Sequence, residues 1–411
     1  MAGELQLSFV YFSKGSYIVV EGKPNAECFF IIREGQVELS KEVEIVAEER
    51  GNNLRPGDFF GVVSAMSGHS YIETARARTD VTLISVQRKQ YGQLIRNNAP
   101  VAMKILRQFS RRMRYLDQAL TFLTLHSSAA VDSRHLYKVA EYYAKQNRYG
   151  QAFYACSRYV KYCPDAENIA TAKALLSELA PYAQTVRLDF SAKDTEREYP
   201  KDAMIFAEGE PGEELFIIKK GSVKITKVVG NNEVLLAVLK TGDVFGEMAL
   251  LETEPRAASA VAYSECRLTV LNRANFEQTI TVQPQLIAYI TALQAERIWF
   301  IYKQLANTRL SDPLARMYDI LLIQLERRRI KVNTRHSFTF DFGPVELTDM
   351  IGVSQPEGER LIGKLLKNRH IQIFHDRICV LDVSEIARQT AYLRKMQQIE
   401  NGRAEKNIFF R

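Results

Sequence analysis

Two stretches of this 411-residue chain repeat each other, and the duplication constrains the fold more than any other feature. Residues 21–35 read EGKPNAECFFIIREG, and residues 208–221 read EGEPGEELFIIKKG. Further along, PGDFFGVVSAMSGHSYIETARA from Pro56 matches TGDVFGEMALLETEPRAASA from Thr241. A repeat of this length indicates a duplicated domain rather than a solenoid. We call the two domains the first copy and the second copy.

Each copy is a series of short apolar runs rich in Val, Ile and Phe, separated by Gly, Pro, Asn and Asp. The runs cover residues 29–32, 37–39, 215–218, 223–225 and 234–239. Such runs are typical of antiparallel strands joined by tight turns. The sequence therefore predicts a β-roll or jelly roll for each copy.

The second copy contains a candidate binding site at residues 245–260, FGEMALLETEPRAASA. Gly246 lets the backbone approach a ligand, and a short helix over Met248–Leu251 would point unpaired N–H groups at an anion. Arg256 adds a charged fork suited to phosphate oxygens. Glu247 would repel a phosphate unless it accepted a hydrogen bond from a hydroxyl on the same ligand. A phosphodiester and a ribose hydroxyl on one compact ligand satisfy all these groups, which predicts a cyclic nucleotide.

The same stretch resembles the phosphate-binding cassette of cyclic nucleotide-binding domains, as in catabolite activator proteins and in regulatory subunits of cyclic-AMP-dependent kinase. The resemblance implies that Glu247 binds the ribose 2′-hydroxyl and that Arg256 binds the cyclic phosphate. The candidate site residues in the second copy are Gly246, Glu247, Met248, Ala249, Arg256, Ala257, Ala258, Ile225 and Leu236. Relatives selective for cyclic GMP usually carry Thr or Ser at the position of Ala257, so we expect cyclic AMP to be preferred. Cyclic GMP and cyclic di-GMP remain open, and no metal is expected.

The first copy departs from the cassette at both charged positions. Val62 stands where the second copy has Glu247, and Tyr71 stands where it has Arg256. Valine has no acceptor and tyrosine carries no charge, so neither replaces the lost group. His69 and Arg76 lie nearby and are the alternatives for holding an anion. We expect the first copy to be a structural or regulatory relic, or to bind a different ligand.

Two helical stretches separate the copies. Residues 96–125 are basic, with RQFSRRMRYL at their centre, and are interpreted as a helix packed on its own β-roll, with a nucleic-acid patch as the alternative. Residues 133–181 have helical spacing and resemble a single tetratricopeptide-like unit. One such unit needs neighbours to bury its apolar face. We interpret it as a spacer whose tyrosines pack between domains, with a peptide groove as the alternative.

A long helix is predicted over residues 284–307, with proline at its start and no breaker inside. An apolar stripe at near-heptad spacing comprises Ile287, Ile290, Ile298, Ile301 and Leu305. The resemblance implies that this helix pairs with its symmetry mate, which predicts a homodimer. Trp299 and Tyr302 have two open interpretations: stacking on the nucleotide base, or filling the dimer seam.

Residues 312–382 resemble the winged helix-turn-helix of the same regulator family, with a turn at Gly352-Val353-Ser354. Ser354 is the predicted cap of the second helix, and Pro356 is tolerated in a first turn. Gly358 and Gly363 should each weaken that helix by ~1 kcal/mol. The candidate DNA-binding residues are Ser354, Gln355, Glu359, Arg360 and Lys364, of which Arg360 alone clearly matches a contacting position. Residues 384–410 read as a polar helix and tail.

Composition narrows the compartment and the class of function. A formal charge of +7 permits contact with nucleic acid without requiring it. The five cysteines are scattered and include no CxxC pair, which favours a reducing compartment. With no apolar run of membrane-spanning length, we expect a cytoplasmic protein without a membrane partner. No nucleophile–base pair, metal cluster or Walker sequence is present, so we do not expect an enzyme.

These observations predict an α+β chain with two jelly-roll (double-stranded β-helix) cyclic nucleotide-binding domains. The expected boundaries are 1–125 for the degenerate first copy, 126–185 for the spacer, 186–283 for the second copy, 284–308 for the dimerisation helix, 309–383 for the winged helix-turn-helix and 384–411 for the tail. The leading hypothesis is a dimeric DNA-binding regulator that responds to a cyclic nucleotide. The alternative is a cyclic-nucleotide-responsive protein that acts through a protein partner, met by its spacer or first copy.

Overall fold

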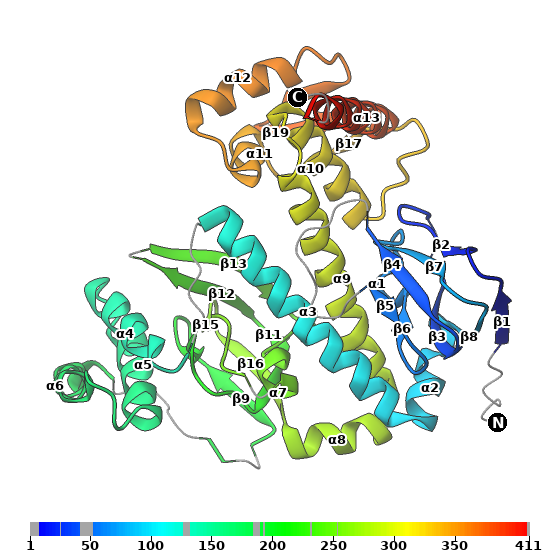
Figure 1. The fold of residues 1–411 in the computed structure, drawn as a ribbon. Helices are drawn as coiled ribbons and strands as arrows, with labels where there is room; N and C mark the ends of the chain where they lie inside the picture. The colour runs from blue at the N-terminus through cyan, green and yellow to red at the C-terminus, as the bar shows by residue number, and fades with distance from the viewer. Residues whose placement is uncertain are drawn as a thin grey trace. The chain divides into compact units, whose positions relative to one another are not determined.

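The computed structural model of the chain describes residues 8–24, 26–41, 52–125, 132–183, 190–191, 194–230, 232–252 and 254–408 (Figure 1). The chain folds as two compact units. The cassette unit comprises residues 1–8 and 86–296, and the C-terminal unit comprises residues 9–85 and 297–411. The strands of the second copy therefore lie in the cassette unit, and those of the first copy lie almost entirely in the C-terminal unit.

The first copy consists of two four-stranded sheets, in the orders β1-β8-β3-β6 and β2-β7-β4-β5. Its strands are β1 (Ser8–Phe12), β2 (Tyr17–Val19), β3 (Cys28–Glu34), β4 (Val37–Ser40), β5 (Asn53–Leu54), β6 (Phe59–Phe60), β7 (Thr74–Ala77) and β8 (Val81–Gln87). A short helix, α1 (Val62–Ser67), lies between β6 and β7.

The second copy repeats this topology strand for strand, with antiparallel sheets in the orders β10-β15-β12-β13 and β14-β11-β16-β9. Its strands are β9 (Glu196–Tyr199), β10 (Met204–Phe206), β11 (Glu214–Lys220), β12 (Ser222–Val229), β13 (Asn232–Lys240), β14 (Val244–Phe245), β15 (Ser259–Ala262) and β16 (Cys266–Asn272). The helix α7 (Glu247–Glu252) occupies the place of α1. The predicted duplication is confirmed.

Aromatic side chains fill the second copy beside its candidate site. The rings of Phe206, Phe216 and Phe245, one from each of β10, β11 and β14, lie 5.2–5.9 Å apart between centroids. All three belong to the buried core of this copy. β10 and β14 are buried at every position, so their residues do not alternate between apolar and polar. Burial of the large rings stabilises the roll.

The stretch interpreted as a spacer forms three helices in the cassette unit: α4 (His135–Lys145), α5 (Tyr149–Tyr162) and α6 (Ile169–Leu179), followed by a 3₁₀ turn, η2 (Ala180–Tyr182). They share one apolar core with strands of the second copy, which includes Val228 and Val261. Tyr143 also reaches across, with its hydroxyl donating to Glu233 at 2.9 Å. The buried tyrosines of this region are thus packing residues, as interpreted from the sequence.

Four helices flank the β-rolls in sequence: α2 (Tyr91–Asn97), which follows the short turn η1 (Arg88–Gln90), α3 (Ala99–Leu125), α8 (Arg273–Val282) and α9 (Pro284–Thr308). Two hydrogen bonds join α2 and α3 to the first half of α9. Tyr91 and Thr291 meet through their hydroxyls at 3.2 Å, and Gln294 donates to Ser110 at 3.3 Å. The helices that follow the first copy thus contact the helix that follows the second.

The apolar stripe of α9 is not an open seam. Ile287, Ile290, Ile298 and Leu305 are at most 1% exposed in the single chain, and Ile301 is half-buried. These residues are therefore buried within the single chain, and the homodimer expected through this helix stays a prediction. A homodimer through these residues would first have to uncover them, at the cost of exposing buried apolar surface to water.

The C-terminal region contains α10 (Pro313–Arg327), α11 (Pro344–Ile351), α12 (Gln355–Leu365) and α13 (Val383–Ile408), with a three-stranded sheet in the order β17-β19-β18. The strands are β17 (Phe338–Thr339), β18 (Ile371–Phe374) and β19 (Arg377–Val380). Gly352 joins α11 to α12 with a positive φ of 66°, as the predicted turn requires. The polar tail predicted after Val383 is α13, anchored by an ion pair between Arg394 and Asp319.

Gly358 has a structural reason that the sequence did not reveal. It is buried on α12, and a Cβ there would lie 2.7 Å from Cγ2 of Thr348 on α11. The glycine thus allows the two helices to approach closely, which offsets its low helix propensity. At Gly363 a Cβ would meet open space, so only the propensity cost remains there.

All five cysteines are free thiols. Within the described ranges, no helix has both the length and the apolar character needed to cross a bilayer.

Candidate functional site

The candidate site is built where β14 turns into α7. Gly246 makes this turn with φ of 78°. A Cβ at this position would lie 2.7 Å from Nη1 of Arg256 and 3.2 Å from the ring of Phe216. Glycine is therefore required at this position for two reasons, which are the positive φ and the close approach of the Arg256 side chain.

Arg256 occupies a slot formed by Gly246, Gly212, Phe206 and Phe216. Its guanidinium lies 4.2 Å from the ring centroid of Phe206, and its Nη1 donates to the carbonyl of Gly246 at 2.6 Å. A Cβ on Gly212 would come within 2.4 Å of its Nε. The residue is only 5% exposed.

The buried guanidinium keeps capacity for an anion. Its Nε has no hydrogen-bond partner among the described residues, although a buried donor normally has one. Burial lowers the pKa of Arg256, while nearby carboxylates, chiefly Glu210, oppose that shift. An incoming phosphate would supply both the missing acceptor and a counter-charge, so the residues present fit a cyclic phosphate.

The other predicted site residues of the second copy lie along the same segment. Glu247 is the first residue of α7 and is buried, as is Ala249, while Met248, Ala257 and Ala258 are partly exposed. Ile225 packs against the core of the roll. Leu236 lies at an irregularity in the β12–β13 register and is half-exposed. The structure thus brings the cassette residues together on one loop and helix, with Leu236 the least enclosed.

Arg114 of α3 also belongs to this site, although the sequence did not identify it. Its Nε forms an ion pair with Glu252 at 2.7 Å, and its Nη1 donates to the carbonyl of Pro255 at 3.1 Å. It therefore ties the end of α7 to the residue before Arg256. Its basic stretch was interpreted as a helix packed on its own β-roll, that of the first copy, and this contact corrects the partner, because it joins α3 to the second copy. Nothing local in the sequence pointed to that partner.

Trp299 and Tyr302, for which the sequence left base stacking and filling of a dimer seam open, contact residues of the first copy. The indole of Trp299 is fully buried and stacks on His69 with 3.9 Å between ring centroids. The hydroxyl of Tyr302 donates to Glu21 at 3.1 Å. Both rings are thus engaged with residues of the first copy, and stacking on a nucleotide base stays a prediction.

The first copy fills its own equivalent site. Tyr71, at the position of Arg256, donates its hydroxyl to the carbonyl of Cys28 at 2.8 Å. A Cβ on Gly61 would lie 3.2 Å from the Tyr71 ring, so the tyrosine occupies the slot that the arginine occupies in the second copy. The backbone N–H of Gly61 donates to the buried carboxylate of Glu73 at 3.0 Å. The Glu73 carboxylate thus accepts the hydrogen bond of the Gly61 N–H at this turn.

Neither alternative anion-binding residue of the first copy is available there. His69 is stacked on Trp299. The Arg76 guanidinium donates from Nε to the carbonyl of Gly15 at 3.0 Å and lies over the ring of Tyr17.

The predicted DNA-binding residues lie on the exposed side of α12. Ser354 stands at the N-cap position, but its side chain makes no cap hydrogen bond, which corrects that detail. Gln355 donates to Glu359 at 3.4 Å. Arg360 and Lys364 are exposed one turn apart.

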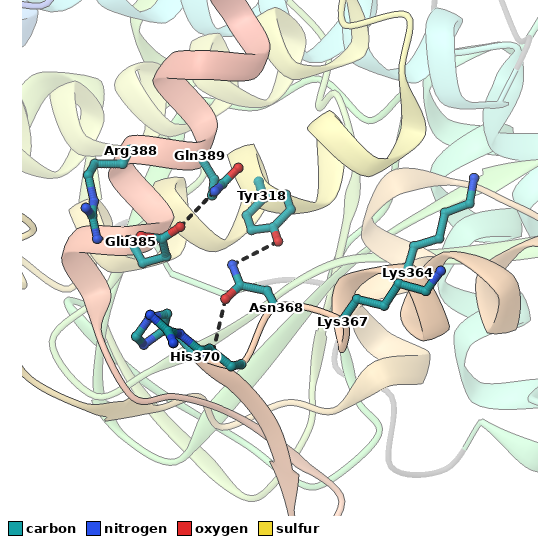
Figure 2. A pocket seen from close by; sticks show the side chains of 9 residues that line it. Tyr318, Lys364, Lys367, Asn368, His370, Glu385, Arg388 and Gln389 are labelled. Atoms are coloured by element: carbon teal, nitrogen blue, oxygen red, sulfur yellow. Dashed lines mark hydrogen bonds and ion pairs between the residues drawn. The ribbon is translucent and has the colours of Figure 1, made fainter.

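A basic cluster continues from Lys364 beyond the end of α12 (Figure 2). It surrounds a hollow of about 500 Å³ whose lining residues are Tyr318, Lys364, Lys367, Asn368, Arg369, His370, Glu385, Arg388 and Gln389. Four of these residues are positively charged, namely Lys364, Lys367, Arg369 and Arg388, and one, Glu385, is negatively charged. That carboxylate, Glu385, is already engaged by Arg388 at 2.5 Å and by Gln389 at 2.7 Å. The surface therefore favours an anion.

Comparison with known families identifies both copies. The model of the cyclic nucleotide-binding domain matches residues 9–98 and residues 196–282. These segments contain α1 with its filled site and α7 with the Arg256 slot, respectively.

Three proteins similar in sequence to this chain are regulators or regulatory subunits. A CRP-like cAMP-activated global transcriptional regulator of Mycobacterium tuberculosis is 25% identical over 47% of this chain and 86% of its own length. The cAMP-activated global transcriptional regulator CRP of Pasteurella multocida is 28% identical over 44% of this chain and 88% of its own. A cAMP-dependent protein kinase regulatory subunit of Pyricularia oryzae is 33% identical over 28% of each chain.

Proposed function

We propose that this chain, which carries two cyclic nucleotide-binding domains and is related in sequence to CRP-like cAMP-activated transcriptional regulators, is itself a cyclic-nucleotide-responsive, DNA-binding transcriptional regulator. The Arg256 slot carries the proposal. It holds a buried guanidinium with an unpartnered Nε beside Glu247, within a segment matched by the family model. The first copy, with Tyr71 in its slot and Glu73 on the Gly61 amide, is proposed to bind no cyclic nucleotide.

We further propose that cyclic AMP is the preferred ligand. Ala257 follows the phosphate arginine and carries no hydroxyl that could meet the guanine amino group. An unpaired buried donor costs about 1 kcal/mol or more, which corresponds to roughly fivefold weaker binding of cyclic GMP. Competition of the two nucleotides against a fluorescent analogue should show this preference in the wild type and a gain for cyclic GMP in Ala257→Thr. Equal affinities in the wild type would refute the proposed discrimination.

The C-terminal region is proposed to be a winged helix-turn-helix that reads DNA with α12. The turn at Gly352, the close contact of Gly358 with α11, and the sheet β17-β19-β18 support this assignment. In the proposed switch, nucleotide binding in the second copy acts on this region through α9, which begins two residues after α8 ends and itself ends at Thr308 before α10. Such a switch works only if the nucleotide has different affinities for the two arrangements.

Arg360 and Lys364 should have separable effects on DNA binding. Arg360 is proposed to contact a base edge, so Arg360→Ala should cost about 1–3 kcal/mol and relax sequence preference. Lys364 leads into the basic cluster of Figure 2, so Lys364→Ala should weaken binding to all sequences and lower the salt slope by about 1. Mobility shifts on genomic fragments at several salt concentrations measure both effects, with the exposed Lys395→Ala on α13 as control.

The same assay decides between this proposal and its alternative. The kinase regulatory subunit among the relatives supports a protein that binds a cyclic nucleotide and acts through a protein partner. Preference for particular fragments in the presence of cyclic AMP supports the regulator. Binding that is salt-sensitive but indifferent to sequence and nucleotide contradicts the regulator and favours the alternative.

A further inference from the structure

Glu210 is fixed beside Arg256 by the backbone. The N–H of Arg256 donates to the Glu210 carbonyl at 2.8 Å, and the N–H of Gly209 donates back to the Arg256 carbonyl at 2.9 Å. The side chain is held as well, since its Oε2 accepts from the N–H of Ala207 at 3.0 Å. Glu210 is only 6% exposed, so its charge is felt strongly by neighbouring groups.

The other oxygen of Glu210 belongs to the helical spacer. Arg158 of α5 forms an ion pair from Nε to Glu210 Oε1 at 3.0 Å, with both side chains almost fully buried. The hydroxyl of Tyr154, one turn earlier, lies 3.3 Å from the same oxygen and 3.1 Å from the carbonyl of Ile205, and it can donate to either. The Arg158 guanidinium lies over the Tyr154 ring, 4.9 Å from its centroid, so the two side chains hold each other in place.

The Glu210 carboxylate is therefore ion-paired with Arg158 and also acts electrostatically on Arg256, whose backbone is bonded to its own. Burial raises the pKa of Glu210, and Arg158, the N–H of Ala207 and Arg256 oppose that shift. If Arg158 loses its charge, the attraction of Glu210 falls on Arg256 alone. If Glu210 loses its charge, Arg256 retains more attraction for an external anion. The two changes should move the phosphate affinity of Arg256 in opposite directions.

We propose that Arg158 and Tyr154 of the spacer are positioning residues for the cyclic-phosphate site, and that they act through Glu210 on Arg256. This rests on the proposed function only in taking a cyclic nucleotide as the ligand of Arg256. By linkage, a phosphate bound to Arg256 also changes how firmly Glu210 holds α5. The spacer is then coupled to the occupancy of the site, beyond joining the two copies.

The test is calorimetry of cyclic AMP with the full chain. Arg158→Met should weaken binding on the order of fivefold, Arg158→Lys should retain most of the wild-type affinity, and Glu210→Gln should tighten binding. The double variant Arg158→Met, Glu210→Gln should bind within about twofold of the wild type, because the unpaired carboxylate is gone. Arg148→Met is the control, since Arg148 bridges the spacer to Glu233 by a separate ion pair at 2.5 Å.

Several outcomes would overturn the proposal. A purely structural role predicts that Arg158→Met and Glu210→Gln both weaken binding, or that Arg148→Met weakens it as much as Arg158→Met. If Arg158→Met does not fold, Tyr154→Phe keeps the ring, loses the bond to Glu210 and should still weaken binding; no change there contradicts the coupling. A wild type that binds no cyclic nucleotide refutes the proposed function itself, whereas normal binding by all variants refutes the coupling alone.

Discussion

Arg256→Ala is expected to weaken cyclic AMP binding by up to about a hundredfold, because a charge-assisted contact contributes on the order of 2–3 kcal/mol. The guanidinium is enclosed by Phe206 and Phe216 and shielded from water, so little else can replace it. Arg256→Lys should recover only part of the affinity, since an ammonium keeps the charge but lacks the planar fork.

Calorimetry of the full chain measures this loss and the number of sites together. We expect one cyclic nucleotide per chain, because Tyr71 and Glu73 fill the equivalent site of the first copy. Arg267→Ala is the matched control: that arginine lies in the same roll, but its ion pair with Glu198 is exposed, so affinity should stay close to the wild type. Two equivalent sites, or an Arg256→Ala protein of unchanged affinity, would contradict the assignment.

Trp299→Ala is expected to destabilise the C-terminal unit by about 3–5 kcal/mol while leaving cyclic AMP affinity nearly unchanged. The indole is fully buried against His69, so its loss leaves a cavity that the surrounding side chains can only partly fill. Thermal unfolding should show the transition of this unit lowered by roughly 6–20 °C. Trp299→Phe retains a ring for the stack and should recover much of the loss.

The alternative interpretation of Trp299 makes the reverse prediction. If the indole stacked on a purine, Trp299→Ala would weaken nucleotide binding and leave stability largely intact. The two measurements on one variant therefore separate a packing role from a binding role. A large loss of affinity without a shift in unfolding temperature would support the base-stacking interpretation.

The second copy shows what the sequence could predict. Its strands followed from apolar runs and turn residues, and the Gly246–Arg256 pairing followed from a contiguous segment. Both are local signals, in which the residues that matter lie within about one element of each other. The duplication added strength, because each copy predicted the other's topology.

What the sequence could not predict are contacts between distant residues. Arg114 is 138 positions from Glu252, and Tyr154 is 56 positions from Glu210, so no periodicity or motif connects them. The stripe on α9 was identified correctly as apolar, but a pattern of isoleucines does not say which surface will cover it. For Trp299 the sequence likewise left the partner of the ring open, and only the fold shows that it stacks on His69.

The contact of Trp299 and Tyr302 with the first copy has a consequence for how the response depends on protein abundance. In a regulator assembled from separate subunits, the partner that steadies such a helix is lost on dilution. Here His69 and Glu21 lie on the same polypeptide as α9, so the helix meets them at a fixed effective concentration. The steadying of α9 is therefore independent of protein concentration, and under the proposed function the nucleotide level is the variable to which the chain would respond.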